Sequence, residues 1–138
     1  MIRNIVAVIV GLFVGMAVNM ALIMLNAYVL FPMPTGMDMN DPAQLNEYVA
    51  TLPTAGFLVP LAAHLGQSFV GGCVAARLGS SRPILLAMIV GLCSLAGGAY
   101  MMTTVDGPSW MVIELPLYLV VAWLAGRMEV NRRATTAA

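Results

Sequence analysis

Four long apolar runs constrain the fold of this chain more than any other feature of its sequence. The runs cover residues 5–31, 55–76, 83–102 and 110–126. A helix needs roughly 17–25 apolar residues to cross a bilayer, and each run is that long or longer. Hydrophobic residues make up 61% of the chain and charged residues 9%, against about 45–50% and 25% in soluble domains. We therefore expect one integral membrane domain over residues 1–138, an all-α membrane protein built as a four-transmembrane-helix bundle.

The basic residues predict which way the bundle is oriented. All six are arginines, and they lie near the termini or between the second and third runs: Arg3, Arg77, Arg82, Arg127, Arg132 and Arg133. The connections 32–54 and 103–109 contain neither Lys nor Arg. Because basic residues favour the cytoplasmic side, we expect both termini in the cytoplasm and the chain in a bacterial inner membrane. The net charge of zero gives no reason to expect nucleic acid as a partner.

The longer outer connection is typical of a short helix over residues 42–51. Asp41 can cap that helix, Pro42 suits its first position, and Gln44 completes a capping box. Its apolar side chains share one face: Leu45, Tyr48, Val49 and Leu52. We expect a short extracytoplasmic amphipathic helix, either lying on the membrane surface or packed over the end of the bundle.

Small residues recur in the runs at spacings that let helix backbones approach closely. Gly11 and Gly15 form such a pair in the first run, and the other runs contain similar sets. These faces can pack within one bundle, or they can bind a second copy or another membrane protein. The helix ending 71-GGCVAAR-77 resembles the Gly-Gly-x-x-Ala-x-Arg ending of uncharacterised small four-helix bacterial membrane proteins. That resemblance implies no function.

Polar side chains within the runs predict a candidate pocket, because such groups usually face the protein interior or a water-filled cavity. The candidates are His64, Glu114, Asn19, Asn26, Gln67 and Tyr118. Counted from the outer ends of the runs, Glu114 and Asn26 lie nearest the outer surface. His64 lies deeper, and Asn19 and Gln67 lie deepest. We expect His64 and Glu114 to face each other on neighbouring helices, in a pocket that opens outward and has Asn26 in its upper part.

Two interpretations of these polar groups stay open. In the first, they line a pocket, and the protein is a non-enzymatic membrane protein that binds a ligand or assists assembly. In the second, they only hold the helices together, and Glu114 extends to the outer interface. The alternative function is an oligomeric, transporter-like protein that moves protons or metal ions. An enzyme would need a nucleophile or metal ligand beside His64 and Glu114, and the sequence offers none, so we expect neither catalysis nor a cofactor.

Methionine gives one further signal. The chain contains twelve, and the outer loop segment 33-MPTGMDM-39 resembles the Mets motifs of copper-handling membrane proteins. Thioethers are soft ligands that favour Cu(I), so the resemblance implies a Cu(I) site at Met33, Met37 and Met39. That family has three spans, whereas four are expected here. A stripe at positions 16, 20 and 24 could instead fill gaps in a tight core.

Overall fold

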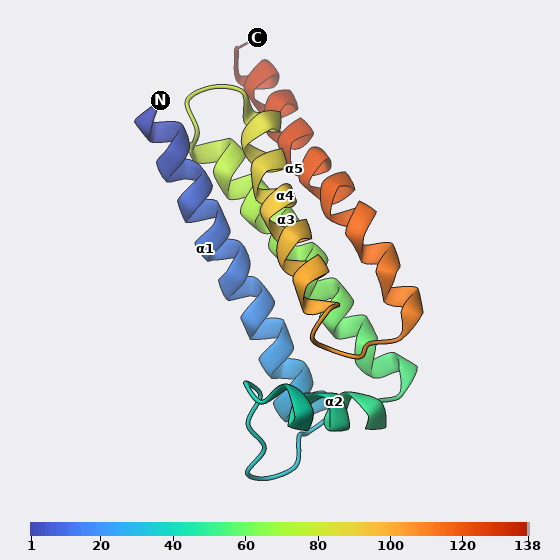
Figure 1. The fold of residues 1–138 in the computed structure, drawn as a ribbon. Helices are drawn as coiled ribbons and strands as arrows, with labels where there is room; N and C mark the ends of the chain where they lie inside the picture. The colour runs from blue at the N-terminus through green and yellow to red at the C-terminus, as the bar shows by residue number, and fades with distance from the viewer. Residues whose placement is uncertain (138) are drawn as a thin grey trace.

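The computed structural model describes residues 1–137 of the chain, and these residues form five helices and no strand (Figure 1). They are α1 (Ile2–Leu25), α2 (Pro42–Thr51), α3 (Leu58–Leu78), α4 (Pro83–Met101) and α5 (Glu114–Ala137). Short helical turns extend three of the long helices. The resulting segments Ile2–Leu30, Thr54–Leu78, Pro83–Met101 and Ser109–Thr136 are long and apolar enough to cross a membrane. The expected all-α fold with four such helices is confirmed.

The last helix is longer than its apolar run, because polar contacts continue it. The run was predicted to end at residue 126, but α5 continues to Ala137. In this extension Glu129 is buried and accepts hydrogen bonds from Arg132 and Arg133, three and four residues further along. Ion pairs at these two spacings stabilise a helix. A prediction from apolar length alone stops before them.

The helix α3 is the centre of the bundle, and it packs against α1, α4 and α5. Glycines let α1 approach it closely. A Cβ atom at Gly11 would lie 2.5 Å from the carbonyl oxygen of Gly71, and a Cβ at Gly71 would lie 2.7 Å from that of Gly11. Similarly, a Cβ at Gly91 of α4 would lie 2.5 Å from the methyl group of Ala122. Gly11, Gly71 and Gly91 are therefore used for helix packing within this chain.

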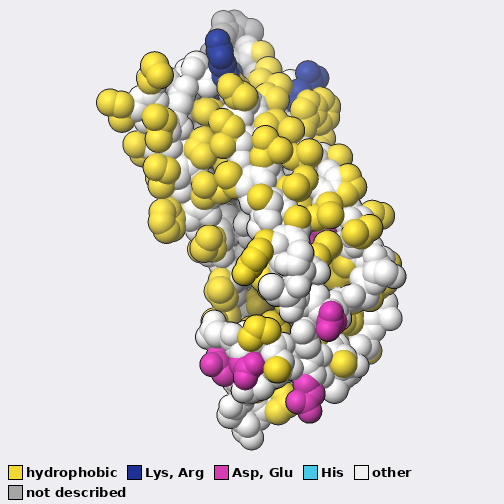
Figure 2. All heavy atoms as spheres, viewed as in Figure 1, with side chains coloured by type: hydrophobic (Ala, Val, Ile, Leu, Met, Phe, Trp, Pro, Cys, Tyr) yellow, Lys and Arg dark blue, Asp and Glu magenta, His cyan; other side chains and the backbone are white. Residues whose placement is uncertain are grey.

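The termini and the α3–α4 turn lie at the same end of the bundle (Figure 1), where side chains bind the end of α3. Arg133 donates to the carbonyl oxygens of Ala76 and Gly79 over 2.7 and 2.9 Å. The Oδ1 atom of Asn4 accepts from the backbone and the hydroxyl of Ser80. On the face drawn in Figure 2, basic side chains lie at this end and acidic side chains lie towards the other.

The short helix α2 lies across the opposite end (Figure 1). Its residues Tyr48 and Val49 are buried, so its apolar face is turned towards the protein. Asn46 binds the α4–α5 connection through the carbonyl of Thr104 at 3.2 Å and the N–H of Asp106 at 2.9 Å. Of the two predicted placements, this is the one packed over the bundle.

The predicted cap of α2 is present, but its partner residue bonds differently. The Asp41 carboxylate accepts from the N–H of Ala43 at 2.9 Å. In a capping box Gln44 would accept from the N–H of Asp41. Instead, Gln44 accepts from the N–H of Asp38 and donates to the Asp41 carboxylate. The N–H of Asp41 is already used by the carbonyl of Asp38.

Candidate functional site

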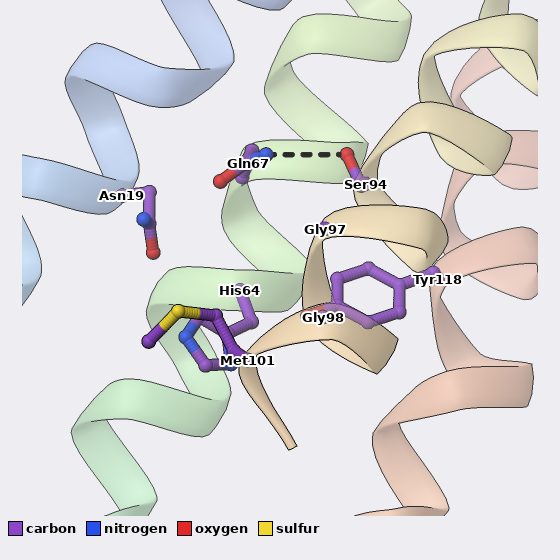
Figure 3. Close-up of a pocket in the computed structure, with 8 residues that line it drawn as sticks. All are labelled: Asn19, His64, Gln67, Ser94, Gly97, Gly98, Met101 and Tyr118. Carbon is purple, nitrogen blue, oxygen red and sulfur yellow. Dashed lines mark hydrogen bonds between the residues drawn. The ribbon is translucent and has the colours of Figure 1, made fainter. Parts of the chain in front are cut away.

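A cavity of about 150 Å³ lies among the four long helices, in the half of the bundle nearer to α2. Each of these helices contributes to its lining: Asn19 from α1, His64 and Gln67 from α3, Ser94, Gly97, Gly98 and Met101 from α4, and Tyr118 from α5 (Figure 3). An apolar cavity of about this volume can hold a six-membered ring. Four of the residues predicted for the pocket line this cavity, namely Asn19, His64, Gln67 and Tyr118, whereas Glu114 and Asn26 do not.

His64 and Glu114 form the ionisable pair at this cavity. The Nδ1 atom of His64 lies 2.9 Å from Oε2 of Glu114, so a single proton lies between them. The Glu114 side chain is 2% exposed and that of His64 is 21% exposed. Glu114 is thus enclosed behind the histidine, which itself lines the cavity. With Nδ1 engaged, the Nε2 atom of His64 remains to bind a ligand or exchange a proton.

Local structure explains why Glu114 is tolerated at so buried a position. It is the first residue of α5, after a 3₁₀ turn over Ser109–Ile113. The N-terminus of a helix carries partial positive charge, which favours a carboxylate. One turn later, the Tyr118 hydroxyl lies 3.4 Å from Oε1 of Glu114, to which it donates. Both carboxylate oxygens therefore have a hydrogen-bond partner.

Tyr118 and Ser68 fix the position of the pair between α3 and α5. The rings of Tyr118 and His64 stack, with their centroids 6.5 Å apart and their planes at 28°. Ser68, one turn after His64, donates to the carbonyl oxygen of Tyr118 at 2.8 Å. Gly98 of α4 makes room for the tyrosine, because a Cβ atom there would lie 2.5 Å from the Tyr118 hydroxyl oxygen.

The deeper part of the cavity is amide-rich and incompletely hydrogen-bonded. Gln67 donates to the hydroxyl oxygen of Ser94 over a long 3.4 Å. The Oδ1 atom of Asn19 is buried and has no hydrogen-bond partner among residues 1–137. A buried acceptor without a donor is costly, and a bound water or ligand that donates a hydrogen bond would remove that cost.

Asn26 does not line the cavity, contrary to the prediction. It is buried at the start of a π-helical turn, Asn26–Leu30, and donates to the carbonyl of Gly56 at 3.1 Å. Its seven-residue spacing from Asn19 places both on one side of α1, but it also moves Asn26 roughly 10 Å along the axis. There Asn26 meets the backbone before α3 instead of the pocket.

Sequence reasoning also left four lining residues out of the site: Ser94, Gly97, Gly98 and Met101. Ser94 and Gly98 belong to the small residues of the third run, for which the sequence predicts only helix packing. The doublet Gly97–Gly98 was the signal available, because two adjacent glycines leave two sides of a helix without side chains. Only Gly98 is filled by a neighbour. A Cβ atom at Gly97 would meet nothing within 4 Å.

The methionines lie away from the cavity, with the exception of Met101. The three loop methionines are partly buried, and the Cu(I) site remains a prediction: Met33, Met37 and Met39. The α1 stripe is not core packing, because Met16, Met20 and Met24 are 54%, 46% and 43% exposed. Within the described part of the chain, no three His, Cys, Asp or Glu side chains group as a metal site.

The geometry can therefore bind a small hydrogen-bonding group and hold a proton between an imidazole and a carboxylate. Comparison of the chain with protein-family models, with curated proteins and with solved structures gives no match. Function has to be inferred from this site.

Proposed function

We propose that this chain is a multi-pass integral membrane protein that binds a ligand with a small hydrogen-bonding group and does not transform it chemically. The observation that carries the proposal is His64, which lines a cavity with unused hydrogen-bonding capacity and pairs at 2.9 Å with Glu114 behind it. A pair that served only to join helices would not need a cavity beside it. Here the free imidazole nitrogen and the unpartnered Asn19 Oδ1 remain for a ligand.

In the proposed arrangement, the chain spans a bacterial inner membrane with both termini in the cytoplasm. The support is the distribution of charge, with the arginines at the end of the termini and acidic residues of α2 and its flanking loop at the other end. The cavity then belongs to the outer half of the membrane, and α2 is extracytoplasmic. A cysteine introduced at Asn40 should react with a membrane-impermeant thiol reagent from outside. Reaction only after the membrane is opened would reverse the orientation.

The inner half of the bundle favours binding over transport. Beyond Gln67 and Ser94, the residues that the structure describes as buried between α1, α3 and α4 have apolar or small side chains, among them Ala75, Leu86 and Val90. The Gly11–Gly71 contact closes the same region with backbone against backbone. A proton or metal ion would therefore have no polar route from the cavity to the cytoplasmic end in this conformation.

The test compares what co-purifies with the wild type and with two leucine variants. Gly97→Leu should fill the cavity, since a Cβ atom there enters open space. The matched control Ala96→Leu changes the adjacent, exposed residue, which does not line the cavity. Organic extracts analysed by mass spectrometry should contain a compound shared by the wild type and Ala96→Leu but lost from Gly97→Leu. Identical extracts from all three proteins would contradict ligand binding at this cavity.

A further inference from the structure

The cavity has a side that is not closed by a helix–helix contact. In the inner half, Val8 and Leu12 of α1 pack against a cluster that contains Leu86 and Val90 of α4. This contact between α1 and α4 is small compared with the contact of α1 with α3. Towards the other end of the bundle, the cavity takes the place of such a contact, with Asn19 on one wall and four α4 residues on another (Figure 3).

Helical periodicity explains this gap on the α4 side. Leu86 and Val90 are four residues apart, and Gly97 and Met101 follow seven and eleven residues after Val90. Residues at these spacings lie on one face of a helix, so Gly97 and Met101 continue the stripe that faces α1. Gly97 has no side chain to continue the packing made by Val90. The missing side chain leaves the space open.

The same helical periodicity explains the gap on the α1 side. Asn19 lies seven residues after Leu12 and so shares the face that is turned towards α4. Beside it, the exposed Met16 and Met20 continue around α1 to the outside of the bundle. On α4, Gly97 is exposed and Met101 is 44% exposed. Neither α2 nor the α4–α5 connection contributes to the lining. The exposed side chains of α1 and α4 at this level of the bundle are therefore apolar.

We propose that the ligand reaches the cavity sideways from the bilayer, between α1 and α4, and that it is an uncharged alkylphenol-like amphiphile. This inference rests on the proposed function and names the class of its ligand. A hydroxyl-bearing ring occupies the cavity, and an apolar tail lies along the crevice beside Met16 and Met20. The outward opening expected from the sequence is thereby replaced by an opening to lipid.

Three features of the cavity specify this chemistry. His64 and Glu114 can compensate each other's charge, so the site offers no net charge to a charged head group. The volume of about 150 Å³ matches a six-membered ring, and the stacked rings of His64 and Tyr118 form an aromatic wall. The buried Oδ1 of Asn19 lacks a donor, so the ring should carry a hydroxyl group, which donates as well as accepts.

Spin labelling tests the route directly. In a background with Cys73→Ala and Cys93→Ala, Gly97→Cys and the control Ala96→Cys are each labelled with a nitroxide and placed in lipid nanodiscs. Oxygen concentrates in the bilayer, whereas a neutral nickel chelate stays in water. We expect collisions with oxygen and hardly any with nickel at both sites. The label at position 97 takes up cavity space itself, as leucine would, so it reports only which solvent the opening faces.

Other results of the spin-label experiment would overturn the lateral route. Strong nickel collisions at position 97 would overturn the lateral route but leave ligand binding intact, because the cavity would then open to water. Absence of collisions with either probe would also overturn it. The binding of 4-decylphenol is measured separately, on unlabelled protein, by native mass spectrometry. Binding should be lost in Gly97→Leu, kept in Ala96→Leu, and weaker for phenol without the tail. Equal binding by Gly97→Leu, or by phenol, would refute the proposed class.

Discussion

Replacement of His64 by leucine tests whether Glu114 depends on it in the folded protein. The Glu114 side chain is 2% exposed, and its other partner is the Tyr118 hydroxyl at a distance of 3.4 Å. Loss of one member of a buried pair leaves an uncompensated charge and typically costs about 3–5 kcal/mol. We expect His64→Leu to lower the free energy of unfolding by that amount. The control Gln67→Leu removes only a 3.4 Å hydrogen bond and should cost about 1 kcal/mol.

The double variant His64→Leu/Glu114→Leu separates charge burial from a general loss of packing. Apolar residues that replace both members of a buried pair are often neutral or stabilising. The double variant should therefore be more stable than His64→Leu, although it carries one more substitution. Reversible unfolding in mixed micelles, followed by circular dichroism, measures all four proteins. Two results together would refute the buried pair. The first is that His64→Leu costs no more stability than Gln67→Leu, and the second is that the double variant is less stable than His64→Leu.

Three further predictions concern the ends of the bundle. Arg133→Ala removes two hydrogen bonds to the end of α3 and one to Glu129, so unfolding should become easier by about 2–4 kcal/mol, against about 1 kcal/mol or less for the exposed Arg132→Ala. Hydrogen bonds from Gln44 and the Ala43 N–H hold the pKa of Asp41 below its ordinary value of 3.8. Its cap is thus complete above that value and lost as the pH falls through the lowered pKa, so the protection of α2 amides relative to their intrinsic exchange rates should fall in acid, and Asp41→Asn should abolish this dependence. If the loop binds copper, a competition assay should detect Cu(I) binding to the wild type and its loss on replacement by leucine of Met33, Met37 and Met39.

The long helices were predictable because the membrane requirement acts on local sequence. A run of apolar residues specifies a spanning helix whatever its neighbours are. The pairing of His64 with Glu114 was predictable for a related reason, since both are ionisable, lie within roughly one helical turn of each other in expected depth and need a partner away from lipid. The extension of α5 beyond residue 126 was not, because it depends on contacts of Glu129 and Arg133 rather than on hydropathy.

The shape of the pocket could not be derived from one sequence. The depth of a residue along its helix axis does not give the rotation of the helix about that axis. The relative placement of α1 and α4 is set by their separate packing on α3. Asn26 is an example: it lies on the expected face of its helix, but its side chain binds the Gly56 carbonyl instead of lining the pocket. The opening beside Gly97 depends on what α1 places opposite it, which a periodic pattern does not specify.

Glycine has two opposite effects in this bundle, and an alanine scan should separate them. At Gly11 a Cβ atom would lie 2.5 Å from the Gly71 carbonyl oxygen, so Gly11→Ala must push α1 away from α3 and lower stability. At Gly97 a Cβ atom meets nothing within 4 Å, so alanine adds only its better helix propensity, about 0.5–1 kcal/mol. Gly97→Ala should therefore stabilise the fold while it narrows the cavity and weakens ligand binding, as expected where a site is kept open at a cost in stability. If Gly97→Ala destabilised the protein as Gly11→Ala does, α1 and α4 would have to touch at this level, and the lateral opening would not exist.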